Sequence, residues 1–414
     1  MNYTNFDKPF TRVYAAGGGA GELVAGYLDA VEAGRIDGIT LDNVNTAAIV
    51  PMADSGGGIA DVRKLHPEHG PLGGDGRKSI SALSRSRQAA RIFESRFAED
   101  TTIDHIQASQ EDLLKALSEE PGGMDSFRMS EIMARSLDFA KDMQRFRELD
   151  GRTLKGLTLG HLTMTALALE LGDTDLAAQE GGKLMNTRAE VIPVSTVPHH
   201  LWMRDGPAEV DGNPRNNMIY GEHEIDEYTP AFPHDLDLGL YPVVPGTGIT
   251  PNPRAVKAVD QLGEFVAGPS SRRTSLGAIL IPLQDHLQRP KEEGMTFALG
   301  GNLTAVKSEP ETNGEDHVAE IEKFAGRKID VIIAHKRPDL IPGGKGVRFD
   351  VRKLRREGYT VVETDLVNLE RAEQDPNSPI KKEATVKTNY VALATAVKDM
   401  PVPPRNNLED LVSV

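Results

Sequence analysis

Short apolar runs of the kind that form buried strands alternate with helical patterns along most of this chain. Two of these runs, Thr11–Ala16 and Ala47–Met52, flank a helical segment from about Gly21 to Ala33. Four more follow in the second half, at Glu264–Ala267, Thr296–Leu299, Asp330–Ala334 and Tyr359–Glu363. Short apolar strands separated by helices are typical of a parallel sheet that is covered on both faces. We therefore expect an α/β fold with a mainly parallel sheet.

Two stretches depart from this alternation. Between Lys78 and Lys183 the pattern is almost wholly helical, and we expect its charge-rich part, about residues 98–151, to be a helical insertion. From about residue 190 to 246 polar and apolar residues alternate among many Pro, His and Asp, which predicts a flap or hairpins. We expect residues 1–371 to form a single domain and residues 372–414 to form a linker and C-terminal tail.

Charge and composition narrow the classes of function. The formal net charge of −15 argues against nucleic acid and anionic membranes as partners, because basic patches hold both. The chain has no cysteine, which excludes thiolate chemistry and disulfides and favours a reducing compartment. The N-terminal residues lack a signal-peptide pattern, and the most apolar window, Leu157–Leu171, is too short and polar to span a bilayer. We expect a cytoplasmic protein.

Two glycine-rich loops follow the first two expected strands. Gly17, Gly18, Gly19 and Gly21 lie where the first strand gives way to a helix, which is where open parallel sheets bind ligands. The loop has neither the dinucleotide fingerprint, because position 22 is Glu, nor a Walker A motif. A tight turn without a ligand is the alternative.

The second loop contains Asp54, Ser55, Gly56 and Gly57. An Asp at a strand end can hold Mg²⁺ or accept a hydrogen bond from a sugar hydroxyl, and the alternative is an Asx-turn.

Two later loops complete the set. Asp75 and Arg77 lie in a glycine-rich loop before a helix, where Arg77 could meet phosphate or form a surface salt bridge. Gly268, Ser270, Ser271 and Thr274 follow a strand, where hydroxyls and amides suit phosphate or ribose but also suit a simple helix cap. Arg272 and Arg273 would add positive charge to such a phosphate contact. The histidines lack the spacing of a metalloprotease site, so no zinc is expected. The absence of a GxSxG elbow disfavours a hydrolase of that type.

Five motifs in order resemble the CofD/YvcK family, which has GGGTG, ADDGGSSGRLR, PPGDIR, HSLGN and GPGSLYTS. The corresponding stretches here are GGGAG (Gly17–Gly21), ADSGGGIADVR (Ala53–Arg63), GGDGR (Gly73–Arg77), LTLGH (Leu157–His161) and GPSSRRTS (Gly268–Ser275). The resemblance implies a Rossmann-like three-layer sandwich with a nucleotide diphosphate lying across the strand ends. Ser55 replaces an Asp of the family, and Arg272-Arg273 replaces Leu-Tyr, which marks a divergent member.

The family has two branches with different roles. YvcK-type proteins, the gluconeogenesis factors, bind UDP-sugars in control of carbon and cell-envelope metabolism. CofD-type 2-phospho-L-lactate transferases use Mg²⁺ and move a phosphoryl-linked small acid from a guanosine diphosphate ester to a deazaflavin hydroxyl, and GMP leaves. The motifs look more YvcK-like, so we expect a nucleotide-diphospho-sugar-binding protein. The alternatives are the transferase, with Asp54 as catalytic Mg²⁺ ligand, and a non-catalytic scaffold with a degenerate pocket.

The expected ligand contacts share a position at a strand end or helix start. They are Gly17, Gly18, Gly19, Gly21, Asp54, Ser55, Gly56, Gly57, Asp75, Arg77, Gly160, His161, Gly268, Ser270, Ser271 and Thr274. Gly160 and His161 enter this set through the resemblance alone. The expected partner is a nucleotide or nucleotide-sugar, and a homo-oligomer is compatible with the sequence.

Overall fold

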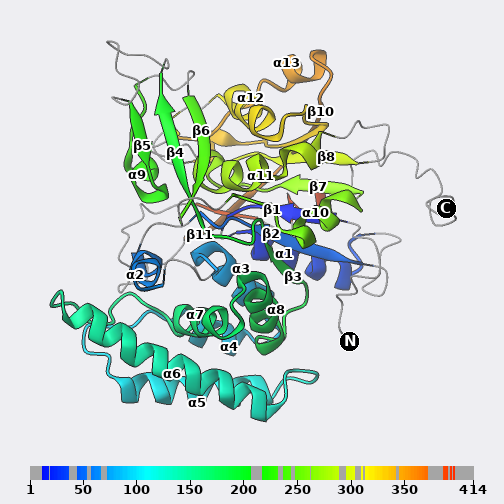
Figure 1. Ribbon diagram of the computed structural model, residues 1–414. Helices are drawn as coiled ribbons and strands as arrows, with labels where there is room; N and C mark the ends of the chain where they lie inside the picture. Colours follow the sequence, from blue (N-terminus) through cyan, green and yellow to red (C-terminus); the bar gives the residue numbers. More distant parts are fainter. Residues whose placement is uncertain are drawn as a thin grey trace, which may run out of the picture.

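A seven-stranded parallel sheet forms the centre of the computed structural model (Figure 1). The structure describes residues 12–17, 19–36, 44–53, 57–66, 72–206, 217–231, 236–243, 248–261, 263–288, 295–303, 309–310, 313–341, 345–371, 386–389, 392–393 and 395–396. The strand order is β10-β9-β8-β7-β1-β2-β3. The strands are β1 (Arg12–Ala15), β2 (Thr46–Val50), β3 (Glu190–Pro193), β7 (Glu264–Ala267), β8 (Thr296–Gly300), β9 (Val331–His335) and β10 (Thr360–Thr364).

The predicted parallel sheet is confirmed, and burial explains why its strands read as continuous apolar runs. Every residue of β1, β2, β7, β8 and β9 is buried, as expected where helices cover both faces. The sequence did not predict β3, which pairs in parallel with β2 through Val191 and Ala48. Residues 190–193 therefore belong to the main sheet, and the smaller sheet begins after them.

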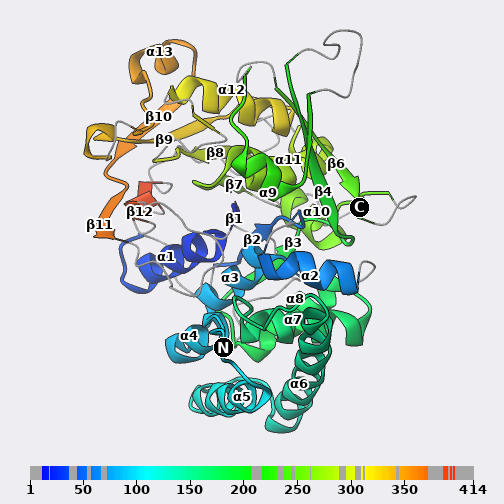
Figure 2. The same ribbon diagram turned by 90° about the vertical axis from the view of Figure 1, so that its left-hand side faces the viewer.

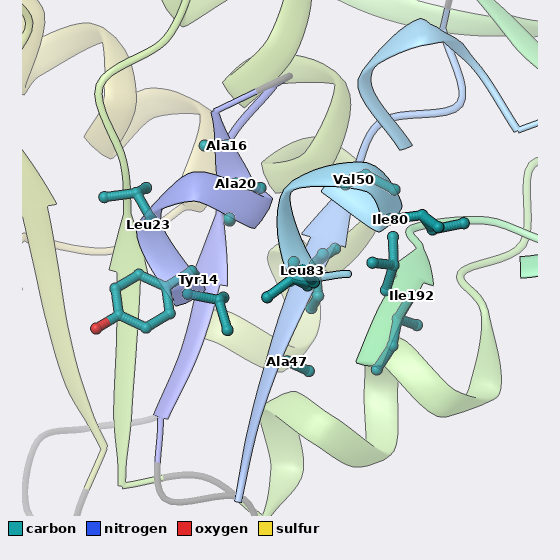
Figure 3. Packing of buried hydrophobic residues seen from close by; sticks show 14 of the residues in the cluster. Tyr14, Ala16, Ala20, Leu23, Ala47, Val50, Ile80, Leu83 and Ile192 are labelled. Carbon is teal, nitrogen blue, oxygen red and sulfur yellow. The ribbon is translucent and has the colours of Figure 1, made fainter. Parts of the chain in front are cut away.

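Helices lie on both faces of the sheet because the chain winds outward in two directions. The crossover from β1 to β2 contains α1 (Ala20–Glu32), whereas the path from β7 to β10 runs the opposite way through α11 (Ala278–Leu287), α12 (Gly314–Ala325) and α13 (Val351–Arg356). Right-handed crossovers in opposite directions place their helices on opposite faces. Apolar side chains of α1 and of α3 (Gly74–Leu83) pack over β1, β2 and β3 (Figure 3).

The stretch expected to be a helical insertion, about residues 98–151, is helical, and it belongs to a larger group of five helices. This group forms a layer of its own beside the main sheet, with α5 and α6 outermost (Figure 1). The layer comprises α4 (Arg87–Glu94), α5 (Ile103–Ser118), α6 (Ser126–Glu148), α7 (Leu159–Leu171) and α8 (Thr174–Leu184). Local sequence fixes the starts of these helices, since the side chains of Thr102, Asp125, Thr158 and Asp173 accept hydrogen bonds from free backbone amides.

A small antiparallel sheet with the order β5-β4-β6 stands at the edge of the molecule in both views (Figures 1 and 2). Its strands are β4 (His199–Asp205), β5 (Met218–Tyr220) and β6 (Leu236–Pro242), and α9 (Glu222–Glu227) follows β5. Leu201 and Met203 pack with Ala53, Ile225 and Ala278 in a separate buried cluster. The small sheet thus lies against the strand ends of the main sheet.

The remaining elements connect or close the main layers. They are α2 (Gly57–Leu65), α10 (Pro253–Asp260), the π-helical segment η1 (Arg272–Gly277), the 3-10 turn η3 (Pro338–Leu340), β11 (Val367–Arg371) and β12 (Val386–Thr388). β11 and β12 pair antiparallel, and Leu393 is fully buried, so part of the segment expected to be a linker and tail packs onto the body. Within the described ranges, no helix is long and apolar enough to cross a membrane.

Candidate functional site

The carboxyl end of β1 is the point where three of the glycine- and hydroxyl-rich loops meet. A Cβ atom at Gly17 would lie 2.8 Å from Asp75 Oδ2 and would overlap the Ser275 hydroxyl. Ser275 Oγ in turn lies 3.5 Å from Asp75 Oδ2, at the limit of a hydrogen bond. Residues 258 positions apart in the chain therefore converge at one strand end, and a larger residue at position 17 would displace the Asp75 and Ser275 side chains.

The α1 N-terminus begins at this convergence. Ala20 N donates to Gly17 O at 2.9 Å, and Leu23 N donates to Gly19 O at 3.0 Å. Gly19 is the N-cap residue and has no side chain to cap the first turn, whose amide Gly21 N donates instead to Ser79 Oγ. The positive end of the α1 dipole still favours an anion at this point. Gly18 lies outside the described residues.

Several expected contact glycines have a packing explanation. A Cβ at Gly21 would lie 2.5 Å from Ser79 Cα, so α1 and α3 can approach only because residue 21 is glycine. Ser79 Oγ also accepts a hydrogen bond from Gly21 N at 3.2 Å. Added Cβ atoms at Gly160 and Gly268 would overlap Phe93 and Leu23, respectively. Close packing therefore accounts for glycine at these three positions without a ligand.

The second loop can be placed only through the residues at its two ends. Asp54, Ser55 and Gly56 lie outside the described residues, and Gly57 begins α2. Before the loop, Met52 O accepts a hydrogen bond of 2.6 Å from Nη2 of the buried Arg63 on α2. This bond ties α2 to the carboxyl end of β2. The loop thus starts and ends at the same edge of the sheet as Gly17.

Arg77 and His161 are engaged within the protein. The buried Arg77 guanidinium forms an ion pair with Glu94, whose other oxygen accepts a hydrogen bond of 2.7 Å from Ser81. His161 Nδ1 accepts a hydrogen bond of 3.0 Å from Thr158 N and so completes the capping box of α7. Burial, followed by the charge of Arg77, holds the pKa of His161 well below its ordinary value, so the ring is neutral.

The fourth loop offers hydroxyls, and its arginines are already paired. Ser271 Oγ caps η1 at Thr274 N and donates to Glu309 Oε1 at 2.7 Å. Thr274 Oγ1 donates to Asp226 on α9 at 3.0 Å, which ties the small sheet to the site. Ser270 Oγ is buried and, among the described residues, has no hydrogen-bond partner. A buried hydroxyl without a partner favours a ligand at this point.

Arg272 and Arg273 do not supply the free positive charge that the sequence suggested. Both side chains are buried, and both contact Glu320, at 2.9 and 2.8 Å. Arg272 Nε also lies 3.2 Å from Glu309 Oε2. Although burial acts to raise the pKa of Glu309, the two guanidinium groups hold it below its ordinary value. Burial raises the pKa of Glu320. The positive charges of Arg272 and Arg273 are thus neutralised inside the protein by the carboxyl groups of Glu309 and Glu320.

His199 is a site candidate that sequence reasoning passed over. It is fully buried where β4 begins, and its Nδ1 lies 3.0 Å from Ser195 Oγ, just past β3. Its Nε2 is buried and, among the described residues, lacks a hydrogen-bond partner. Burial, with the charge of Arg63 as a second cause, lowers the pKa of His199 to about 3. The adjacent His199 and His200 were visible in the sequence, but nothing there distinguished the buried ring.

Comparisons with known proteins agree with this arrangement. The family model described as "2-phospho-L-lactate transferase CofD" matches residues 13–367. This chain belongs to the CofD family. It is 25% identical over 369 residues to a putative gluconeogenesis factor of Aquifex aeolicus, covering 86% of this chain and 89% of that protein. It is 24% identical over 241 residues to the gluconeogenesis factor of Bacillus subtilis, covering 55% and 70%.

The fold is shared with a solved structure. A crystal structure of a UPF0052-family protein from Bacillus halodurans superposes with a TM-score of 0.63 at 18% identity, covering 94% of this chain and 99% of that one. The predicted family resemblance and the predicted α/β layered fold are therefore confirmed.

Proposed function

We propose that this CofD-family chain binds a nucleotide diphospho-sugar, or a similar nucleotide ester, at the carboxyl edge of its sheet, as a YvcK-type protein of carbon or cell-envelope metabolism. The observation that carries the proposal is the convergence of Gly17, Asp75 and Ser275 at the N-terminal end of α1. Both relatives are named gluconeogenesis factors, which supports the YvcK-type branch of the family.

In this proposal the diphosphate lies against the backbone at Gly17, where the positive end of the α1 dipole attracts it. Asp75 accepts hydrogen bonds from ligand hydroxyls, and the hydroxyls of Ser270 and Ser275 serve as donors or acceptors at the same edge. His199 Nε2 is a neutral acceptor for a hydroxyl or N–H group of the ligand. This set recognises a ligand rich in hydroxyl groups.

The name of the matching family model supports a second candidate, a transferase of the 2-phospho-L-lactate type. That reading assigns Mg²⁺ to Asp54, which lies outside the described residues. Among the residues that are described, no three His, Asp or Glu side chains come together to hold a metal ion. We therefore derive no step through Mg²⁺, and Asp54 as its ligand stays a prediction.

A thermal-shift screen tests the binding proposal, because a ligand that binds the folded state raises the melting temperature by mass action. The screen contains UDP-sugars, guanine nucleotides and NAD, each with and without Mg²⁺. We expect a concentration-dependent rise with at least one nucleotide diphosphate ester. No shift with any nucleotide at about millimolar concentration, where binding as weak as about 0.1 mM would still register, would refute both candidates.

Variants locate the site once a ligand is found. Asp75→Asn and Ser275→Ala should each weaken binding at least severalfold, because each removes a hydrogen-bonding group beside Gly17. Asp104→Asn is the matched control, since Asp104 is also an aspartate in a first helical turn but is exposed on α5. Equal affinities for all three variants would place the ligand elsewhere. Product formation by the wild type, assayed with a guanosine diphosphate ester, would favour the transferase.

A further inference from the structure

The outward side of the small sheet carries a cluster of aromatic rings. Along β4, His199, Leu201, Met203 and Asp205 are buried, whereas the alternate residues His200, Trp202 and Arg204 are partly exposed. Trp202 stands opposite Tyr220 of β5 and Gly239 of β6, and His200 stands opposite Tyr241. Directly opposed residues share one side of a sheet. We call His200, Trp202, Tyr220 and Tyr241 the aromatic face.

The rings of the aromatic face are packed side by side and remain accessible. The centroids of His200 and Tyr241 are 5.3 Å apart, and those of Tyr220 and Tyr241 are 6.0 Å apart in an edge-to-face arrangement. A Cβ at Gly239 would lie 2.6 Å from Trp202 Nε1, so the indole rests against the bare backbone of β6. Tyr220 is 52% exposed. The chain has only 21 Trp, Tyr and Phe residues in 414, so three of them on one side of a three-stranded sheet is a local enrichment.

This face lies in an acidic part of the molecule. Among the described residues between 199 and 243, six are acidic and one is basic, a formal charge of −5. The basic residue, Arg204, forms an ion pair with Asp237 on the same side of the sheet. Glu224 of α9 is close enough to act electrostatically on both His200 and Tyr241. Burial lowers the pKa of His200, so its ring adds no positive charge at neutral pH.

We propose that the aromatic face docks an arginine-bearing segment of a partner protein. A guanidinium group stacks on aromatic rings while it is attracted to nearby carboxylates, and it is less strongly hydrated than an ammonium. Electrostatic repulsion argues against two other occupants, a second copy of this chain and nucleic acid. A second copy would bring the same excess of negative charge against this surface, and nucleic acid would bring phosphates. The surface is separate from the nucleotide edge, so this inference does not depend on the proposed function.

The single tryptophan of the chain makes the test direct, because Trp202 fluorescence reports on this face alone. The full chain is titrated with three synthetic ten-residue peptides in which Gly alternates with Arg, Lys or Glu. We expect a saturable fluorescence change with the Arg peptide, a weaker affinity for the Lys peptide, and no change with the Glu peptide. The affinity for the Arg peptide should fall as salt rises.

Ring-deletion variants separate stacking from general charge attraction. Tyr220→Ala and Tyr241→Ala should each weaken binding of the fluorescein-labelled Arg peptide about two- to fivefold, from the usual strength of one cation–π contact. Phe127→Ala, which removes an exposed ring on α6, is the control and should change nothing. Equal binding of the Arg and Lys peptides, or unchanged affinity in both tyrosine variants, would overturn the proposal. A dimer in sedimentation that Tyr220→Ala dissociates would also overturn it.

Discussion

The ion pair that joins the helical insertion to α2 gives the sharpest test of the structure. Arg147, near the end of α6, donates to Asp61 Oδ2 through Nε at 3.1 Å and through Nη2 at 2.8 Å. Its Nη1 donates to the carbonyl oxygens of Thr153 and Lys155 at 3.0 and 2.9 Å. The Arg147 and Asp61 side chains are only 7% and 5% exposed. We predict that Arg147→Met strongly destabilises the protein.

The size of the effect follows from what the change leaves behind. Removing one partner of a buried pair costs about 3–5 kcal/mol, because the other charge stays buried without compensation. Here Asp61 keeps Arg152, whose guanidinium lies 2.9 Å from Oδ2 but is 43% exposed. Because this remaining charge is partly solvated, it offsets part of the loss. We therefore expect a loss of about 2–4 kcal/mol in the free energy of unfolding.

Urea denaturation followed by circular dichroism measures this loss. The control is Arg145→Met, two residues away on α6, whose 77% exposed side chain lies 3.4 Å from the exposed Asp142 and should contribute under about 0.5 kcal/mol. The double variant Asp61→Leu with Arg147→Met removes both buried charges, so it should be more stable than Arg147→Met alone. If Arg147→Met costs no more than Arg145→Met, the buried link between insertion and core does not exist as described.

Three further substitutions test the close packing at Gly21, the pKa of His199 and the buried charges around Glu309. Gly21→Ala should cost about 1–3 kcal/mol, because its methyl meets the Ser79 backbone, whereas Gly248→Ala, with open space around it, should be near neutral in the same denaturation assay. His199 has a folded pKa of about 3, below its unfolded value, so the stability it contributes is present above about pH 6.5 and is lost as the pH falls towards 3. Stability measured from pH 7 to pH 5 should therefore fall about 2 kcal/mol less in His199→Asn than in the wild type, and parallel curves would contradict this. Glu309→Gln should cost about 3 kcal/mol in urea denaturation, since Arg272 and Arg273 would share one carboxylate, and a neutral result would contradict the buried network.

The sheet was predictable from sequence where a strand is buried on both faces. An apolar run such as DVIIA is too short for a buried helix, so the sequence alone predicted the strand β9. The strand β3 was missed because Glu190 and Pro193 give EVIP a polar, broken appearance, and only pairing with β2 makes it a strand. Its pattern merged with the alternating stretch that follows it.

The first, third and fourth glycine-rich loops lie at strand ends or helix starts, as predicted, but the sequence could not show which of their glycines face the site and which face neighbouring helices. Gly17 and Gly21 belong to one motif, yet Gly17 faces Asp75 and Ser275 whereas Gly21 faces the backbone of α3. The second contact joins residues 58 positions apart, and no local pattern encodes it. The same holds for Arg272 and Arg273, whose partner Glu309 lies beyond the next strand and the loop after it.

The internal pairing of these arginines bears on the kind of ligand that the edge can recognise. Arg77, Arg272 and Arg273 were the cations that the sequence placed next to a phosphate, and each is matched to a carboxylate inside the protein. Attraction of a diphosphate then rests mainly on the positive end of the α1 dipole, which is weaker than the full charge of a guanidinium. A ligand held in this way needs additional contacts through its hydroxyl groups, and Asp75 and Ser275 are placed to make them. We therefore expect the sugar or acid portion to contribute more to affinity than in an arginine-lined site. A nucleotide-sugar should then bind more tightly than the free nucleoside diphosphate in the same thermal-shift assay, and the reverse order would contradict this reasoning.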